Sequence, residues 1–139
     1  MIVLDTNVVS EMMRSRPDPA VERWTAGQDF ETLRLSAVTI AEVAFGIARL
    51  ASGRRRDRLT EKLDETVAMF EGRILPFDTE TARLYGTLAA RAQKAGRTLP
   101  VADGYIAATA ALTGFAVATR DTEPFEAVGL AVIDPWAAA

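Results

Sequence analysis

The chain has 139 residues and a mass of 15.0 kDa, a length from which we expect one globular domain spanning residues 1–139. Hydrophobic residues make up 49% of the sequence and charged residues 25%, a balance that supports a buried core. The sequence contains no Cys and no His, which excludes disulfides, iron–sulfur clusters, zinc sites built on these residues and triads that need His. Chemistry at neutral pH would therefore rest mainly on carboxylates.

No segment of the sequence suits a membrane or secretion. The longest uncharged stretch, 104–119, has 16 residues, fewer than the roughly 20 that a membrane-spanning helix needs. The first residues carry no basic region ahead of an apolar stretch, so we expect a cytoplasmic protein without a membrane partner. A net charge of −3 and a pI of about 5.0 argue against a broad nucleic-acid-binding face but allow a local one.

Strand and helix signals alternate along the chain. Apolar and β-branched runs bounded by turn residues predict four strands, at 2–4, 33–36, 74–77 and 115–118, and a possible fifth at 130–133. Capping residues and apolar periodicity predict a helix after the turn 5–7 and further helices at 19–26, 38–51, 54–71, 78–95 and 101–113. Because long helices connect successive strands, we expect an α/β fold with a central, mostly parallel sheet of four to five strands.

The predicted helix 38–51 has an unusual composition. Apolar residues fill most of its positions, so we expect it to be mostly buried, with its end at Gly53. Its polar residues and its glycine fall on one narrow stripe, made of Thr39, Glu42, Gly46 and Arg49.

Four acidic residues are expected at one edge of the sheet. Asp5 and Asp121 each follow the end of a predicted strand, and ligands bind beyond the carboxyl ends of parallel strands. Glu42 follows the second strand and Asp103 lies in the first turn of the helix that leads to the fourth, so both can face the same edge. Oxygen ligands without nitrogen or sulfur favour Mg²⁺ or Mn²⁺. Such an ion lowers the pKa of bound water and binds phosphate, which predicts metal-assisted hydrolysis of a phosphodiester.

Each acid also has a purely structural interpretation. Asp5 can cap the following helix, and Glu42 can lie on a solvated stripe. Asp103 is favoured by the dipole of its helix, and Asp121 can form an Asx turn before Pro124. The occurrence of all four together favours a shared site over four separate structural roles.

Arginine supplies 14 of the 16 basic residues, and its guanidinium group suits bidentate contacts with phosphate. The dense cluster at 54–56 and Arg58 is interpreted as the solvated start of a helix. Arg14 and Arg16 follow the Asp5 turn and lie nearer the expected path of a phosphate backbone.

Four segments, taken in order over nearly the whole chain, resemble the PIN-domain ribonucleases, and among them the VapC and FitB-like toxins of bacterial toxin–antitoxin pairs. The segments are 2–10, 36–46, 100–108 and 118–136, the last including Thr119-Arg120-Asp121 and Asp134-Pro135-Trp136. The resemblance implies a three-layer α/β/α fold. It further implies Mg²⁺ or Mn²⁺ held by four acids and supported by two threonine hydroxyls, the residues being Asp5, Glu42, Asp103, Asp121, Thr6 and Thr119.

The resemblance also implies an activity and partners. The family's substrate is RNA, cleaved by metal-activated water, and its usual partner is an antitoxin whose tail blocks the site. Toxins of this type form homodimers and assemble further with the antitoxin. The sequence departs from the family at one point, because many relatives carry Asn directly after Thr-Arg and Asp three residues later, whereas Asp121 and Pro124 occupy these positions here. Asp121 is therefore the candidate for the fourth acid.

Two other functions are compatible with an acidic sheet edge. A PIN-like module without catalysis would serve only as a binding partner, and the presence of all four acids argues against it. A phosphoacceptor signalling domain would need a Lys at the end of a strand. The two lysines, Lys62 and Lys94, both fall in predicted helices, which argues against that function.

Overall fold

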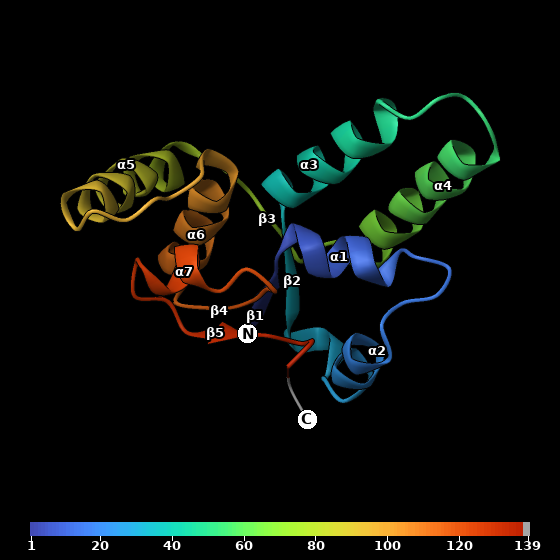
Figure 1. Cartoon of the computed structure of the whole chain (residues 1–139), viewed down its shortest axis with the longest axis horizontal. Coiled ribbons are helices and arrows are strands. Elements are labelled where there is room, and N and C mark those ends of the chain that lie inside the picture. The colour runs from blue at the N-terminus through green and yellow to red at the C-terminus, as the bar shows by residue number, and fades with distance from the viewer. Residues whose placement is uncertain (138–139) are drawn as a thin grey trace.

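The computed structural model describes residues 1–137, so the last two residues of the predicted domain 1–139 lie outside the described range. This part of the chain forms an α/β fold (Figure 1). The elements in chain order are β1 (Ile2–Leu4), α1 (Thr6–Met12), α2 (Pro19–Ala26), the 3-10 helix η1 (Phe30–Thr32), β2 (Leu33–Ser36), α3 (Ala37–Ala48), α4 (Arg54–Met69), β3 (Ile74–Leu75), α5 (Thr79–Lys94), α6 (Val101–Thr113), β4 (Ala116–Ala118), α7 (Glu123–Glu126) and β5 (Val132–Ile133).

The five strands form one sheet in the order β3-β2-β1-β4-β5, and each neighbouring pair is parallel. β1 is the central strand, with Ile2 opposite Leu33 on one side and Ala116 on the other. The prediction of a mostly parallel sheet with up to five strands is confirmed. This topology brings the carboxyl ends of β1 and β4 side by side, and the segments that follow both strands start from the same edge.

Helices cover both faces of the sheet, which gives the predicted three layers. Val3 and Leu4 are adjacent on β1 and point to opposite faces, so they belong to two separate cores. Val3 packs with residues of α5, α6 and α7, and Leu4 packs with residues of α1, α3 and α4. Figure 1 shows α5, α6 and α7 on one side of the strands and α1, α3 and α4 on the other.

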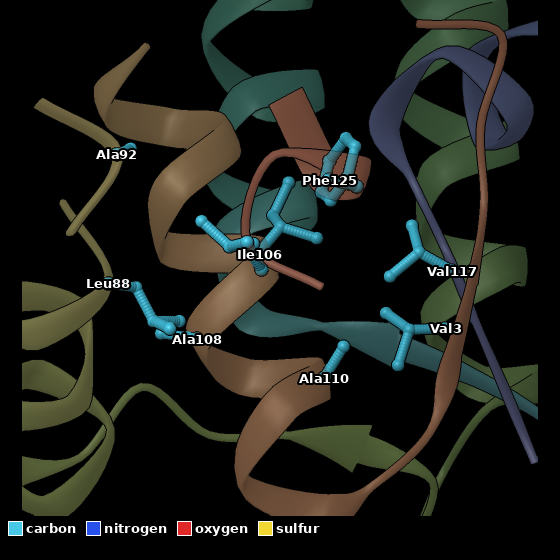
Figure 2. Close-up of a cluster of buried hydrophobic side chains, with 10 residues drawn as sticks. Val3, Leu88, Ala92, Ile106, Ala108, Ala110, Val117 and Phe125 are labelled. Carbon is cyan, nitrogen blue, oxygen red and sulfur yellow. The ribbon is translucent and has the colours of Figure 1, made fainter. Parts of the chain in front are cut away.

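Small residues let α6 lie close to its neighbours. Figure 2 shows Ala108 and Ala110 of α6 in the core that contains Val3 and Val117 of the sheet. Gly104, in the first turn of α6, is buried against α5, and a Cβ atom at this position would lie 2.5 Å from a ring carbon of Tyr85. Only glycine fits this approach without a shift of the Tyr85 ring. The contact fixes the first turn of α6, which also carries Asp103.

The prediction for helix 38–51 is wrong in its end and in its burial. α3 ends at Ala48, and Gly53 instead precedes α4 as its N-cap. Three residues of α3 are buried, whereas its outer face is apolar and exposed, including Phe45 with 67% of its surface accessible. An apolar sequence alone does not distinguish a buried face from an apolar surface. The exposed residues of this face are Ala41, Ala44, Phe45 and Ala48.

Other predicted bounds differ by a few residues. The strands predicted at 74–77, 115–118 and 130–133 are shorter in the structure, and the elements η1 and α7 were not predicted. Within residues 1–137 no helix has the length and apolar character needed to cross a membrane.

Candidate functional site

Asp5 caps a helix and belongs to the cluster of four acids. It follows β1, caps α1 by accepting a hydrogen bond from the Thr6 backbone N–H at 2.8 Å, and is only 3% exposed. Its other carboxylate oxygen accepts a hydrogen bond from the Thr119 hydroxyl at 2.7 Å. Burial raises the pKa of Asp5, the charges of Glu42 and Asp121 raise it further, and the hydrogen bonds from Thr119 and Thr6 oppose the rise. Asp5 therefore caps α1 and also lies in one pocket with the other three acids.

Glu42 is attached to the same turn through Thr6. The Thr6 hydroxyl donates a hydrogen bond to Glu42 Oε1 at 2.6 Å and lies 3.3 Å from the hydroxyl of Thr39, which is fully buried. The stripe that carries Glu42 is solvated only in part, because Thr39 is buried, Glu42 is half-buried and Arg49 is exposed. Glu42 and Gly46 both line the pocket that contains the other three acids. Gly46 leaves open space beside the carboxylate, since no atom lies within 4 Å of the position that a Cβ would take.

Thr119 and Asn7 connect the ends of β1 and β4. The Thr119 side chain is fully buried beneath Asp5, and its hydroxyl oxygen accepts hydrogen bonds from Asn7 Nδ2 at 3.2 Å and from the Asp121 backbone N–H at 3.1 Å. The Asn7 side-chain oxygen in turn accepts one from the Arg120 backbone N–H at 3.3 Å. Sequence reasoning assigned Asn7 only to a turn. Its place directly after the first acid is the signal that could have identified it.

Asp103 and Asp121 complete the acidic cluster from two other elements. Asp103 is half-buried in the first turn of α6, and Asp121 is exposed just after β4. Burial raises the pKa of Asp103 to about 6, with further contributions from the negative charges of Asp5, Asp121 and Glu42. Asp103 thus lies close enough to the other three carboxylates for their negative charges to disfavour its own.

One pocket of about 810 Å³ contains all four acids and Thr6 in its lining. Thr119 lies behind this surface, next to Asp5. The pocket also contains Arg14, as expected, whereas Arg16 is absent from its lining. The interpretation of residues 54–56 and Arg58 as a solvated helix start holds only in part, because Arg55 lines the pocket. The lining residues to which sequence reasoning assigned no site role include Glu11, Arg49, Arg120 and Trp136.

The cluster suits a divalent cation by its chemistry but not by its present side-chain positions. Its donors are carboxylate and hydroxyl oxygens, the ligands that Mg²⁺ prefers, and a cation would relieve the repulsion that raises the pKa of Asp103. Among residues 1–137, however, no three Asp, Glu, His or Cys side chains are placed so that they could hold a metal ion. Binding would therefore require side chains of the cluster to move toward one another.

Comparison with known proteins gives consistent matches over the whole fold. A family model described as PIN domain matches residues 2–130. The chain is 52% identical over 137 residues to VapC ribonuclease Y4jK of Sinorhizobium fredii, with 98% of each chain covered. It is 44% identical over 137 residues to Toxin FitB of Neisseria gonorrhoeae, covering 98% of this chain and 99% of that one. The crystal structure of FitAcB from Neisseria gonorrhoeae matches with a TM-score of 0.93 and 43% identity, over 99% of this chain and 100% of the other.

Proposed function

The chain belongs to the PIN-domain family, and on this premise we propose that it is a metal-dependent endoribonuclease that acts as the toxin of a toxin–antitoxin pair. Its reaction would be hydrolysis of RNA phosphodiester bonds with Mg²⁺ or Mn²⁺ as the cofactor. The relatives named as a VapC ribonuclease and as Toxin FitB support the nuclease and toxin parts of the proposal. Because the proposed substrate is RNA, we expect the protein to act in the cytoplasm.

One observation carries the proposal. Four carboxylates from four separate segments line one pocket at the carboxyl edge of the sheet, in a chain that has no His and no Cys. Acids that only capped helices would have no reason to lie in one pocket, where burial and the charges of the other three acids raise the pKa of Asp103. A shared ligand of positive charge explains why the repulsion is tolerated.

In this proposal each residue has a defined task. Asp5, Glu42, Asp103 and Asp121 would hold Mg²⁺ or Mn²⁺, while the Thr119 and Thr6 hydroxyls keep Asp5 and Glu42 in place. A bound divalent cation would lower the pKa of a water molecule and neutralise charge on the phosphate. In the described part of the chain no hydrogen bond holds the carboxylates of Asp103 and Asp121, so these two side chains are free to rotate toward the ion.

The phosphoacceptor alternative receives no support from the fold. Lys62 lies in α4, where its ammonium is 3.8 Å from Glu65, and Lys94 is the last residue of α5. Neither lysine is among the residues that line the pocket, whereas that function would need one beside the acids. The module without catalysis remains as the outcome in which the acids bind no metal and cut no RNA.

We expect a cognate antitoxin and a second copy of the chain as protein partners. The apolar face of α3, made of Ala41, Ala44, Phe45 and Ala48, gives a surface on which a protein partner would bury apolar area. Ala44 and Ala48 also line a smaller pocket between α3 and α4. If coexpression with the neighbouring small gene product leaves toxicity unchanged, the toxin–antitoxin part of the proposal is wrong.

The decisive experiment is an RNA cleavage assay with purified protein. We expect cleavage with Mg²⁺ or Mn²⁺, none in EDTA, and a loss of at least about a hundredfold in the Asp103→Asn variant. Asp64→Asn is the matched control, because Asp64 is an exposed acid of α4 that does not line the pocket. Cleavage that continues undiminished in excess EDTA would overturn the metal mechanism.

A further inference from the structure

A cation–aromatic pair lies at the rim of the acidic pocket. Arg120 and Trp136 both line the pocket, and the Arg120 Cζ atom lies 5.1 Å from the centre of the Trp136 ring. The pair has no role in holding a metal ion, since neither residue offers an oxygen ligand from its side chain. Its position beside the acids therefore calls for a different function.

Strand pairing explains why these two residues meet. Ala118 of β4 lies opposite Ile133 of β5, and the Thr119 backbone N–H donates a hydrogen bond to the Ile133 carbonyl at 2.9 Å. The segments that carry Arg120 and Trp136 consequently leave the same edge of the sheet as neighbours. The Trp136 backbone N–H donates to Asp134 Oδ1 at 2.9 Å, which holds the turn that presents the indole.

The two side chains differ in burial. The Trp136 indole is half-buried and packs against the core that contains Leu4, so its position is fixed from below. The Arg120 side chain is exposed and lies over the ring. The pair thus offers a planar, positively charged surface on a rigid base.

Hydrogen bonds connect this surface to the acidic cluster. The Arg120 backbone N–H donates to Asn7 Oδ1 at 3.3 Å, Asn7 Nδ2 donates to Thr119 Oγ1, and the Thr119 hydroxyl donates to Asp5 Oδ2. Only two side chains, those of Asn7 and Thr119, separate the Arg120 backbone from Asp5. The surface is therefore fixed relative to the acids at which a phosphate would be cleaved.

Resting on the nuclease function proposed above, we propose that Arg120 and Trp136 form a stacking platform for one base of single-stranded RNA next to the cleaved phosphate. Unpaired bases stack on aromatic rings and on guanidinium planes, and such contacts do not depend on base identity. Stacking would add binding energy from a base to the binding energy that a metal ion at the acidic cluster supplies through the phosphate. In a duplex the faces of the bases are already stacked on one another, so the platform selects single strands.

The first test removes the stacked RNA base, the Arg120 side chain of the platform, or both. RNA oligonucleotides with one abasic residue at each position around the cleaved bond are compared between the wild type and Arg120→Ala. We expect one abasic position to lower kcat/KM about tenfold in the wild type, and the same change to have a clearly smaller effect in Arg120→Ala, in which only the Trp136 ring of the platform remains. An equal fall in kcat/KM in both proteins would overturn the proposal. Arg120 would then contribute only its positive charge to RNA binding.

Arg49→Ala is the matched control for this test. Arg49 also lines the pocket and also lies over an aromatic ring, at 5.7 Å from the centre of Phe45, so its removal takes the same charge from the same pocket. We expect Arg49→Ala to keep the abasic penalty of the wild type. Trp136→Phe keeps a smaller aromatic ring at the same place in the fold. This variant should therefore keep part of the fall in kcat/KM that an abasic position causes.

A binding measurement tests the platform without cleavage. Trp24 and Trp136 are the two tryptophans of the chain, so Trp24→Phe leaves the fluorescence of Trp136 alone. In a Trp24→Phe, Asp103→Asn protein with EDTA, we expect single-stranded oligoadenylate to quench this fluorescence and a duplex of equal length not to do so. Absence of quenching, or equal quenching by the duplex, would contradict the platform. Quenching without any cleavage by the wild-type protein would keep the platform and overturn the nuclease function.

Discussion

Asp5 and Glu42 are held in place by threonine hydroxyls, whereas Asp103 and Asp121 have carboxylates that no hydrogen bond holds within residues 1–137. For Asp5, the hydrogen bonds from Thr119 and Thr6 oppose the rise in pKa that burial causes. For Asp103, burial and three neighbouring charges act without any such opposition, and its pKa reaches about 6. The fold thus supplies hydrogen-bond donors to the carboxylates of Asp5 and Glu42, whereas those of Asp103 and Asp121 have none within residues 1–137.

Among variants that alter the hydrogen bonding of the four acids, Thr119→Val is expected to have the largest effect on stability and on metal affinity. It removes the hydroxyl that donates a hydrogen bond to Asp5. Thr119 is fully buried and Asp5 nearly so, and one Asp5 oxygen would lose its donor without gaining access to water. We expect the free energy of unfolding to fall by about 1–3 kcal/mol. The affinity for Mn²⁺ should fall about 10–100-fold, because Asp5 would lose the group that orients it. Chemical denaturation and Mn²⁺ titration measure the two quantities.

Thr109→Val provides the control for Thr119→Val. Thr109 is also buried, but its hydroxyl donates to the Tyr105 carbonyl of its own helix, at 2.8 Å, and lies outside the pocket lining. We expect no change in Mn²⁺ affinity in this variant. If Thr119→Val and Thr109→Val bind Mn²⁺ equally well, the threonine hydrogen bond has no part in the site.

An intermediate and pH-dependent effect is expected from Asp103→Asn in metal-free protein. A folded-state pKa of about 6, against the ordinary 3.8, means that the folded state binds this proton more tightly than the unfolded chain does. The stability contributed by the protonated group is complete below pH 3.8 and is lost as the pH rises through about 6. Because the half-exposed side chain is screened by solvent, we expect Asp103→Asn to be more stable than wild type by only about 1 kcal/mol at pH 7.5, and by nothing near pH 4.

Thermal unfolding at the two pH values, with and without Mn²⁺, measures the effect of Asp103→Asn. The variant should also lose most of the stabilisation that Mn²⁺ gives the wild type, since a ligand stabilises only the state that binds it. Asp64→Asn again serves as the control acid of α4. Equal melting temperatures of Asp103→Asn and wild type at pH 7.5, with equal gains from Mn²⁺, would show that Asp103 serves only the helix dipole.

The smallest effect is expected from Thr6→Val, which removes the hydroxyl bound to Glu42. Glu42 is only half-buried, so water can replace the lost donor. We expect a loss of about 0.5–1 kcal/mol in the free energy of unfolding, less than that of Thr119→Val. A loss equal to or larger than that of Thr119→Val would contradict the ranking of the two threonines by burial.

The sequence predicts those elements whose ends are determined by residues close by in the chain. The bounds of β1, α2, β2 and α6 match the predicted ones, because a capping residue, a glycine or a β-branched run marks each end. The four acids could be identified because parallel strands place their carboxyl ends at one edge. Arg120 and Trp136 could not be identified as a pair, since their contact depends on the pairing of β4 with β5. Which residues of α3 are exposed could not be predicted for a similar reason, because burial is decided by neighbouring elements rather than by apolar content.

The central place of β1 also determines when the site can exist during synthesis. β1 is made first, but its partner β4 begins more than a hundred residues later, at Ala116, and this pairing brings Asp121 to the same edge as Asp5. Contacts between residues so far apart in the chain form late in folding, because the intervening chain must first be ordered. A ribosome-bound chain that stops before β4 therefore has Asp5, Glu42 and Asp103 but lacks Asp121 and the strand that places it. The pocket that contains all four acids can therefore form only after β4 and the segment that follows it have been made.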